Sequence, residues 1–288
     1  MGCDFPLLVK FLFTADKLSV QVHPSDEYAW EKEGCPGKNE MWHVLKADPG
    51  ARLAVGFRED LAGSPPPNRE ALHDAANNGA IESMLNWIDV QAGDTFFVPA
   101  GTVHALGPGL VLCEIQQNSN LTYRLYDYHR LGTDGRPRPL HLDKALDVLR
   151  WRTAAGRTTP LDLNRMNRSS TGLLLAACPH FATEKLWLNS PATFKIGERL
   201  EIWTGLQGEA EFEAGGQWTS CRKGEVVVLP ASAQTLSVHP NPACIFLRSY
   251  RPELEIDLVA PLWAQGFTEE ELRRVCFPGK PLASSDAA

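Results

Sequence analysis

A small set of side chains that can bind a metal occurs at strand-like positions in the first half of the sequence. Gln21 and His23 lie two residues apart in an alternating apolar segment, so both side chains point to one face of a strand. Glu40 stands where another strand-like run begins, and His104 follows a Pro-Ala-Gly turn. Two imidazoles, one carboxylate and one amide oxygen can bind a divalent metal and leave positions open for water or substrate, as catalytic zinc sites do.

Other interpretations of these residues stay open at this level. His23 and His104 can be ordinary strand histidines, and Glu40 can be a loop carboxylate. Two histidines and one carboxylate also meet the description of a non-haem iron site. His43 lies outside the set, because its side chain points to the opposite face of its strand from that of Glu40, as a surface or packing residue does.

A second group of polar side chains follows His104 along the chain. Glu114 and Gln116 share one face of a strand, and Arg124 belongs to the next strand. A polar strand face is costly in a core unless it meets ligand, metal or water. Arg124 is therefore a candidate for binding a phosphate or an oxyanion, and Lys38 can supply a second positive charge. The alternative for Arg124 is a salt bridge to Asp127 or Glu114.

Short strands bounded by Gly, Pro or Asp must bring these residues together. The strands predicted in the first half are Leu7–Phe13, Leu18–His23, Met41–Lys46, Arg52–Phe57, Thr95–Val98, Val103–Leu106, Leu110–Gln117 and Thr122–Tyr126. Those predicted in the second half are Phe181–Leu188, Leu200–Thr204, Glu209–Glu213, Glu225–Leu229, Thr235–Val238 and Cys244–Arg248. Apolar residues three and four apart predict a helical insertion over about residues 68–87 and a further helix over 141–149.

One eight-residue pattern occurs twice. Residues 93–100 (GDTFFVPA) match residues 224–231 (GEVVVLPA) at an offset of 131 residues without a gap. A glycine-acid turn, four strand residues and a Pro-Ala turn are typical of cupin-type jelly-roll barrels, and two copies imply two barrels. The second copy has Thr235 where the first has His104, so we expect the second barrel to be metal-free.

The expected fold is therefore mainly β, with two cupin-type jelly-roll barrels and a small helical insertion in the first half. The predicted divisions are a metal-binding catalytic barrel over residues 1–149, a linker over 150–171, a second barrel over 172–260, and a short helix with a flexible tail over 261–288. Within the last division, Thr268–Glu271 resembles a capping box that opens the helix.

Composition limits the classes of protein that this chain can be. Its 288 residues suffice for two domains, and a formal net charge of -7 argues against binding to nucleic acid or anionic membranes. The seven cysteines form no C-x-x-C pair, which fits free thiols in a reducing compartment. The apolar run near the start has the features of neither a signal peptide nor a membrane span. We expect a cytoplasmic protein, monomeric or homodimeric, that acts on a small molecule.

Four segments, in order along the chain, resemble type I mannose-6-phosphate isomerases of the short bacterial form, which belong to the cupin superfamily. The segments are Gln21–Glu27, Gly37–Trp42, Val98–Ala105 and Glu114–Asp127. The resemblance runs from about Pro6 to Leu149 and more weakly to about residue 250. It implies a zinc-dependent aldose–ketose isomerase that interconverts mannose 6-phosphate and fructose 6-phosphate through an enediol.

The resemblance also implies roles for individual residues. It implies one zinc ion per chain, with the ligands Gln21, His23, Glu40 and His104. The catalytic arginine of the family matches Arg124, and its motif lysine matches Lys38. Either Glu114 or a zinc-bound water can carry the proton between C1 and C2. Phosphate binding is assigned to Lys38 and Arg124, although one arginine cannot easily serve both ends of the sugar.

Two alternatives accompany this expectation. The first is a cupin oxygenase with non-haem iron, which oxygen uptake with iron but not with zinc would favour. The second is an N-terminally truncated pseudoenzyme that binds sugar phosphate, because family members carry several dozen more residues before the first motif. Thermal stabilisation by a sugar phosphate without turnover would favour the second.

Overall fold

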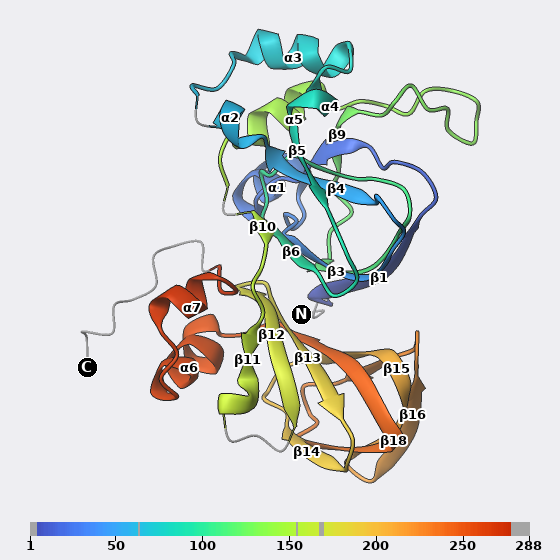
Figure 1. The fold of residues 1–288 in the computed structure, drawn as a ribbon, viewed down its shortest axis with the longest axis vertical. Helices are drawn as coiled ribbons and strands as arrows, with labels where there is room; N and C mark the ends of the chain where they lie inside the picture. Colours follow the sequence, from blue (N-terminus) through green and yellow to red (C-terminus); the bar gives the residue numbers. More distant parts are fainter. Residues whose placement is uncertain (1–4, 63, 154, 167–169, 278–288) are drawn as a thin grey trace. The chain divides into compact units, whose positions relative to one another are not determined.

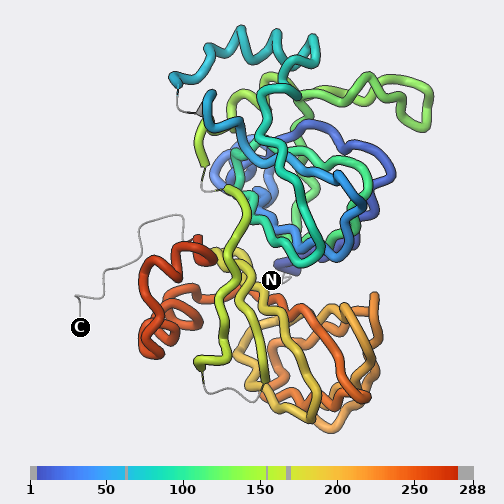
Figure 2. The backbone as a smooth tube through the Cα atoms, viewed as in Figure 1, coloured from blue at the N-terminus to red at the C-terminus, as the bar shows by residue number. Residues whose placement is uncertain are grey.

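Two units divide the chain, one ending at Arg157 and the other beginning at Thr158. The computed structural model describes residues 5–62, 64–153, 155–166 and 170–277 (Figures 1 and 2). The division between the units falls inside the segment 150–171 that the sequence predicts as a linker. The predicted flexible tail from residue 278 lies outside the described residues.

Two five-stranded antiparallel sheets form the framework of the first unit. Their strand orders are β1-β8-β3-β6-β10 and β5-β4-β7-β2-β9. The strands are β1 (Leu7–Thr14), β2 (Val20–Val22), β3 (Glu40–Ala47), β4 (Arg52–Phe57), β5 (Leu85–Asp89), β6 (Thr95–Val98), β7 (His104–Leu106), β8 (Leu110–Gln117), β9 (Tyr123–Tyr126) and β10 (Gly156–Arg157). Segments distant in sequence therefore become neighbours, as β1 and β8 do along their whole length.

Apolar side chains fill the space between the two sheets of the first unit. Trp42 and Phe96 of one sheet belong to the same buried cluster as Leu53 and Leu106 of the other. Glu40 lies two residues before Trp42 on β3, so its side chain shares the inner face of the sheet. Polar residues on this face are thus enclosed between the sheets.

Helices cover the outer face of the sheet that contains β2 and β9. These helices are α1 (Asp26–Glu33), α2 (Glu59–Ala62), α3 (Arg69–Asn77), α4 (Ile81–Met84) and α5 (Leu142–Val148). Leu72 of α3 and Ala145 of α5 lie in one buried cluster with Val20 and Leu125 of the sheet. Within the described residues of the chain, no helix has the length and the apolar character that crossing a membrane requires.

The helical insertion predicted over residues 68–87 ends earlier than expected. Residues 85–89 form β5, which pairs with β4 and places Trp87 opposite Ala54. Leu85 is buried in the cluster beneath the helices, so its apolar spacing fits a strand as well as a helix. Pairing with a neighbouring strand, which local periodicity cannot reveal, decides the structure here.

The segment predicted as a linker also contains short elements. The strand β10 pairs with β6 of the first unit, and β11 (Leu161–Asp162) pairs with β12 of the second. A 3-10 turn, η1 (Leu163–Arg165), follows β11, and β12 (Thr171–Cys178) begins where the predicted linker ends. Elements of two or three residues are too short to produce a periodic pattern in a sequence.

The second unit is built on one eight-stranded sheet. Its main order is β11-β12-β13-β18-β15-β16, while β14 pairs with β18 and β17 pairs with β15. The further elements are β13 (Phe181–Leu188), β14 (Ala192–Lys195), β15 (Glu201–Ala214), β16 (Gln217–Arg222), β17 (Val226–Leu229), β18 (Thr235–Tyr250), the π-helical turn η2 (Glu255–Val259), α6 (Ala260–Ala264) and α7 (Glu269–Arg273). The side chains of Thr268 and Glu271 form a capping box at the start of α7.

The repeated sequence pattern forms a strand in each of the two units. The strands β6 and β17 begin at Thr95 and Val226, and each follows a glycine with a positive φ, 98° at Gly93 and 85° at Gly224. Both strands thus begin at the offset of 131 residues seen in the sequence. The prediction of a mainly β fold is confirmed, and the repeat is compatible with two related barrels.

Candidate metal centre and active site

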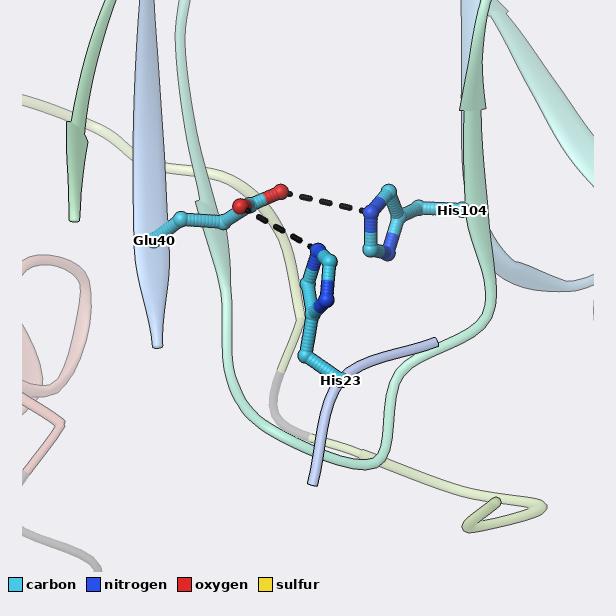
Figure 3. A group of neighbouring side chains, drawn as sticks. All are labelled: His23, Glu40 and His104. Carbon is cyan, nitrogen blue, oxygen red and sulfur yellow. Dashed lines mark ion pairs between the residues drawn. The ribbon is translucent and has the colours of Figure 1, made fainter. Parts of the chain in front are cut away.

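Three buried side chains converge between the sheets of the first unit. The Nε2 atom of His23 lies 3.4 Å from Oε2 of Glu40, and Nε2 of His104 lies 3.3 Å from Oε1 of Glu40. Figure 3 shows the two imidazoles and the carboxylate pointing toward one another. Their potential ligand atoms all lie within 4.8 Å of one another, and each residue is at most 1% exposed.

The atoms that face this point lack ordinary hydrogen-bond partners. Nε2 of His23 and both carboxylate oxygens of Glu40 are buried without a hydrogen bond to any described residue, although His23, His104 and Lys38 make ion-pair contacts with the carboxylate at 3.0–3.4 Å. Buried polar atoms without partners are costly, and a divalent cation would satisfy all three at once. The donor set therefore fits a metal such as zinc.

The opposite ring nitrogens of the two histidines determine which tautomer each imidazole adopts. Nδ1 of His23 lies 2.7 Å from the carbonyl oxygen of Leu121, and Nδ1 of His104 lies 2.9 Å from that of Thr102. A carbonyl oxygen only accepts, so each Nδ1 carries the proton and each Nε2 presents a lone pair, as in metal-bound histidines.

Burial keeps both imidazoles neutral at neutral pH. Burial, assisted by the positive charge of Lys38, lowers the pKa of His23 to about 4. Burial also lowers the pKa of His104, against the opposing effect of Glu40. A neutral imidazole is the form that binds a metal ion.

The structure places Gln21 beside this group with its amide nitrogen toward His104. Gln21 on β2 pairs directly with His104 on β7, and its Nε2 lies 3.1 Å from Nε2 of His104. Its Oε1 accepts a hydrogen bond from Oγ of Ser19 at 3.1 Å. A half-turn of the amide would direct the oxygen toward the group, so Gln21 is positioned to act as the predicted fourth ligand.

Lys38 contacts Glu40 in the set of three side chains that can hold a metal, His23, Glu40 and His104, which we call the metal group. Its Nζ lies 3.0 Å from Oε2 of Glu40, and the residue is 5% exposed. Burial alone would lower the pKa of Lys38, but Glu40 and Glu114 raise it. Burial alone would raise the pKa of Glu40, but the positive charge of Lys38 holds it well below its usual value. The pair is therefore an ammonium and a carboxylate at neutral pH.

Glu114 lies on the inner face of β8, where two side chains hold its carboxylate. Nε1 of Trp42 donates to its Oε1 at 3.2 Å, and Nζ of Lys10 lies 3.1 Å from its Oε2. Lys10 also donates to Oε1 of Gln116 at 2.6 Å. Sequence reasoning missed Lys10. The one feature of the sequence that could have indicated its role is that this charged residue lies inside the apolar strand predicted over Leu7–Phe13.

Arg124 lies in the same row of side chains as the metal group. On β9 it pairs with Gln21, so the two side chains share one face of the sheet. Its Nε is buried without a hydrogen-bond partner among the described residues. Among the described residues, Arg124 forms no salt bridge with Asp127, which was the alternative for this arginine. Asp127 pairs with Arg130 and Arg138 instead.

A close backbone approach holds the segment of Lys38 against the segment of His23. Gly37 donates its N–H to Oδ1 of Asp26 at 2.8 Å, and Lys38 donates its N–H to the carbonyl of Pro24 at 3.0 Å. A Cβ atom on residue 37 would lie 2.4–2.6 Å from backbone atoms of residues 24–26. Only glycine permits this contact, which sets the separation between the two segments.

Amide side chains connect the segments further. Asn39 donates to Oε1 of Gln117 through its backbone N–H at 2.8 Å and through Nδ2 at 2.7 Å. Nε2 of Gln117 donates to Oδ1 of Asp26 at 2.8 Å, and Oδ1 of Asn39 accepts from the N–H of Ala100 at 3.0 Å. The bridge formed by Asp26, Gln117 and Asn39 thus ties together the segments that carry His23, Glu40, Glu114 and His104.

Comparison with known proteins places this chain in a family. A scan against protein-family models finds no match. The mannose-6-phosphate isomerase of Streptococcus mutans is 36% identical over 226 residues, which cover 78% of this chain and 68% of that protein. The mannose-6-phosphate isomerase ManA of Bacillus subtilis is 33% identical over 245 residues, which cover 85% of this chain and 75% of that protein. The chain belongs to the mannose-6-phosphate isomerase family.

Solved structures agree with this membership. The crystal structure of mannose 6-phosphate isomerase from Bacillus subtilis matches with a TM-score of 0.75 at 30% identity, over 86% of this chain and 76% of that one. A variant of phosphomannose isomerase from Salmonella typhimurium matches with a TM-score of 0.63 at 18% identity, over 85% and 79% of the two chains, which shows a shared fold. These relatives favour neither of the two alternatives, the iron oxygenase and the truncated pseudoenzyme.

Proposed function

We propose that the protein is a zinc-dependent aldose–ketose isomerase that interconverts mannose 6-phosphate and fructose 6-phosphate through an enediol. The observation that carries the proposal is the buried group of two neutral imidazoles and one carboxylate, His23, His104 and Glu40, whose potential ligand atoms all lie within 4.8 Å of one another. Relatives named mannose-6-phosphate isomerase support the substrate and the reaction.

One zinc ion per chain would be held by His23, His104 and Glu40, with Gln21 as the fourth ligand after a half-turn of its amide. When bound, zinc supplies a Lewis acid that polarises the sugar oxygens at C1 and C2. The chain's own residues perform the rest of the reaction.

Lys38 acts as a fixed positive charge at the reacting end of the sugar. Its ammonium lies at Glu40, and its raised pKa keeps it protonated, so it stabilises negative charge that develops on O1 and O2. A protonated lysine cannot accept the proton from C2, so Lys38 is not the base of the reaction.

Glu114 is the group that carries the proton. In the aldose-to-ketose direction its carboxylate takes the proton from C2, the C–H electron pair forms the C1–C2 double bond, and the C1=O1 electron pair moves to O1, which gains a proton to give the enediol. Glu114 then returns its proton to C1, where the electron pair of the double bond forms the new C–H bond. The O2–H pair becomes the C2=O2 bond, and the proton that O2 releases balances the one that O1 gained. Trp42 and Lys10 hold the carboxylate in place for both steps.

Arg124 completes the substrate-binding set. Its guanidinium lies on the face shared with Gln21, and its buried Nε has no partner among the described residues. A guanidinium in this position can bind an oxyanion or a phosphate through two parallel hydrogen bonds.

Substitution of one metal ligand tests the proposal. His104→Ala should lose bound zinc and turnover of mannose 6-phosphate together, measured by metal analysis and by a coupled fructose 6-phosphate assay. His73→Ala on α3, a histidine outside the site, should retain both. Retained zinc with normal kinetics in His104→Ala would overturn the ligand assignment. Zinc-loaded protein without turnover would overturn the isomerase itself.

A further inference from the structure

The segment between β9 and α5 carries a group of arginines organised by one buried carboxylate. This segment, residues 127–141, includes the light-green stretch that extends beyond β9 in Figure 1. Asp127, 4% exposed, accepts hydrogen bonds from Arg130 and from Arg138, whose Nε donates to Oδ2 at 2.6 Å. Arg130 also donates to the carbonyl of Lys17, so it is held from two sides.

Arg124 stands close to this pair and shares its electrostatic environment. Burial lowers the pKa of Arg124, the positive charges of Arg138 and Arg130 lower it further, and Asp127 acts in the opposite sense. We call Arg124, Arg130 and Arg138, together with Asp127, the arginine cluster. Three guanidinium groups and one carboxylate leave this cluster two positive charges in excess.

A strained turn maintains the arrangement. Tyr128 and His129 adopt positive φ angles of 54° and 55°, although neither is glycine. Such a conformation costs of order 1 kcal/mol or more for each residue and persists only where the surroundings enforce it. The turn reverses the chain directly after Asp127 and so brings Arg130 back onto that carboxylate.

Arg124 of the arginine cluster and His104 of the metal group lie at the two ends of one row of side chains. Gln21 pairs with His104 on one side and with Arg124 on the other. Neighbouring strands lie about 4.8 Å apart, so the backbones of His104 and Arg124 are roughly 10 Å apart. Lys38, in contrast, contacts Glu40 at 3.0 Å and belongs to the metal end. A six-carbon sugar phosphate likewise separates its reacting carbons from its phosphate.

We propose that the arginine cluster is the subsite for the phosphate of the substrate, with Arg124 and Arg138 binding the phosphate oxygens and Asp127 positioning Arg138 and Arg130. The proposal rests on the proposed function and deepens it, because it leaves Lys38 at the reacting end and moves phosphate binding to the opposite end. A phosphate monoester carries about 1.5–2 negative charges at neutral pH, which matches the excess charge of the cluster. A sugar without phosphate carries no negative charge that could balance the excess positive charge of the cluster.

Equilibrium binding of inorganic phosphate tests the subsite without requiring turnover. In zinc-loaded protein, Arg138→Gln should raise the dissociation constant of inorganic phosphate about tenfold or more, measured by calorimetric titration. The matched control is Arg136→Gln, an exposed arginine two residues away in the same segment, which should change it less than twofold. An equal effect of both substitutions would overturn the proposal, because it would mean that only general charge matters.

Two further measurements keep the test decisive. If Arg138→Gln does not fold, Arg138→Lys keeps the charge but loses the two-point contact, and it should still weaken phosphate binding; unchanged binding would overturn the proposal.

The KM for mannose 6-phosphate should rise by a larger factor than kcat falls in the Arg138 variant. Phosphate binding that depends on Arg138 without any turnover would reject the isomerase and keep the subsite. Turnover with phosphate binding that ignores Arg138 would reject the subsite alone.

Discussion

Individual side chains at the site are held by contacts that a sequence reveals only in part. Strand parity places Gln21 and His23 on one face, and the structure brings both to the same buried group. The alternation of side chains along a strand does not tell which end of an amide group faces a neighbour. In the structure the amide nitrogen of Gln21 faces His104. Lys10 is not predicted as a site residue, because one lysine in an apolar strand forms no pattern. In the structure it contacts Glu114, its partner on the neighbouring strand.

Lys10 should therefore matter for the rate. Lys10→Met removes one of the two side chains that hold the carboxylate of Glu114, so we expect kcat to fall about three- to tenfold, a modest effect because the pair is partly exposed. Lys46→Met removes a lysine from an exposed pair with Asp48 in the same unit and should leave kcat within about twofold. Steady-state kinetics at saturating mannose 6-phosphate measure both variants. Equal rates in the two would show that Lys10 has no part in holding Glu114.

Elements meet at this site through the ends of strands rather than through their middles. Glu40 and His104 are the first residues of β3 and β7, and His23 directly follows β2. Their backbones are tied by Gly37 and by the bridge of Asp26, Gln117 and Asn39. Residues outside the metal group therefore determine how accurately His23, Glu40 and His104 converge.

Asn39 tests this connection between elements. Asn39→Ala removes its side-chain hydrogen bonds with Gln117 and Ala100, which should lower the free energy of unfolding by roughly 2 kcal/mol. The affinity for zinc should fall about tenfold, as for other residues that orient metal ligands. Urea unfolding and a zinc competition titration measure the two effects. Asn120→Ala, at an exposed position after β8, is the control and should change neither. Zinc affinity equal to that of the unchanged protein would show that the bridge does not position the ligands.

Element boundaries mark the limit of prediction from the sequence. The strands that carry the ligands were predictable, because alternating apolar residues and glycine turns flank each of them. The sequence predicts a helix where β5 lies, since the apolar spacing fits both structures and only the pairing with β4 decides. The arginine cluster was not predictable at all, because it depends on the turn at Tyr128 and His129 that returns Arg130 to Asp127.

The whole molecule combines an acidic chain with local positive charge. The formal net charge of -7 repels anions at long range, so an anionic substrate needs a place where positive charge is in excess. Lys38 and the arginine cluster meet this need within the first unit. The second unit repeats the strand pattern at the offset of 131 residues but has Thr235 where the first has His104. We therefore propose that the first unit alone binds the metal and that the second is a metal-free barrel.

This division predicts that zinc stabilises one unit only. A ligand present at 100 times its dissociation constant stabilises the state that binds it by about 2.7 kcal/mol. Scanning calorimetry of the full chain should therefore show one transition that shifts to lower temperature when zinc is removed and one that does not. In His104→Ala, zinc should shift neither transition, which assigns the sensitive one to the first unit. A shift of both transitions by zinc in the unchanged protein, or a remaining shift in His104→Ala, would contradict a single metal site in the first unit.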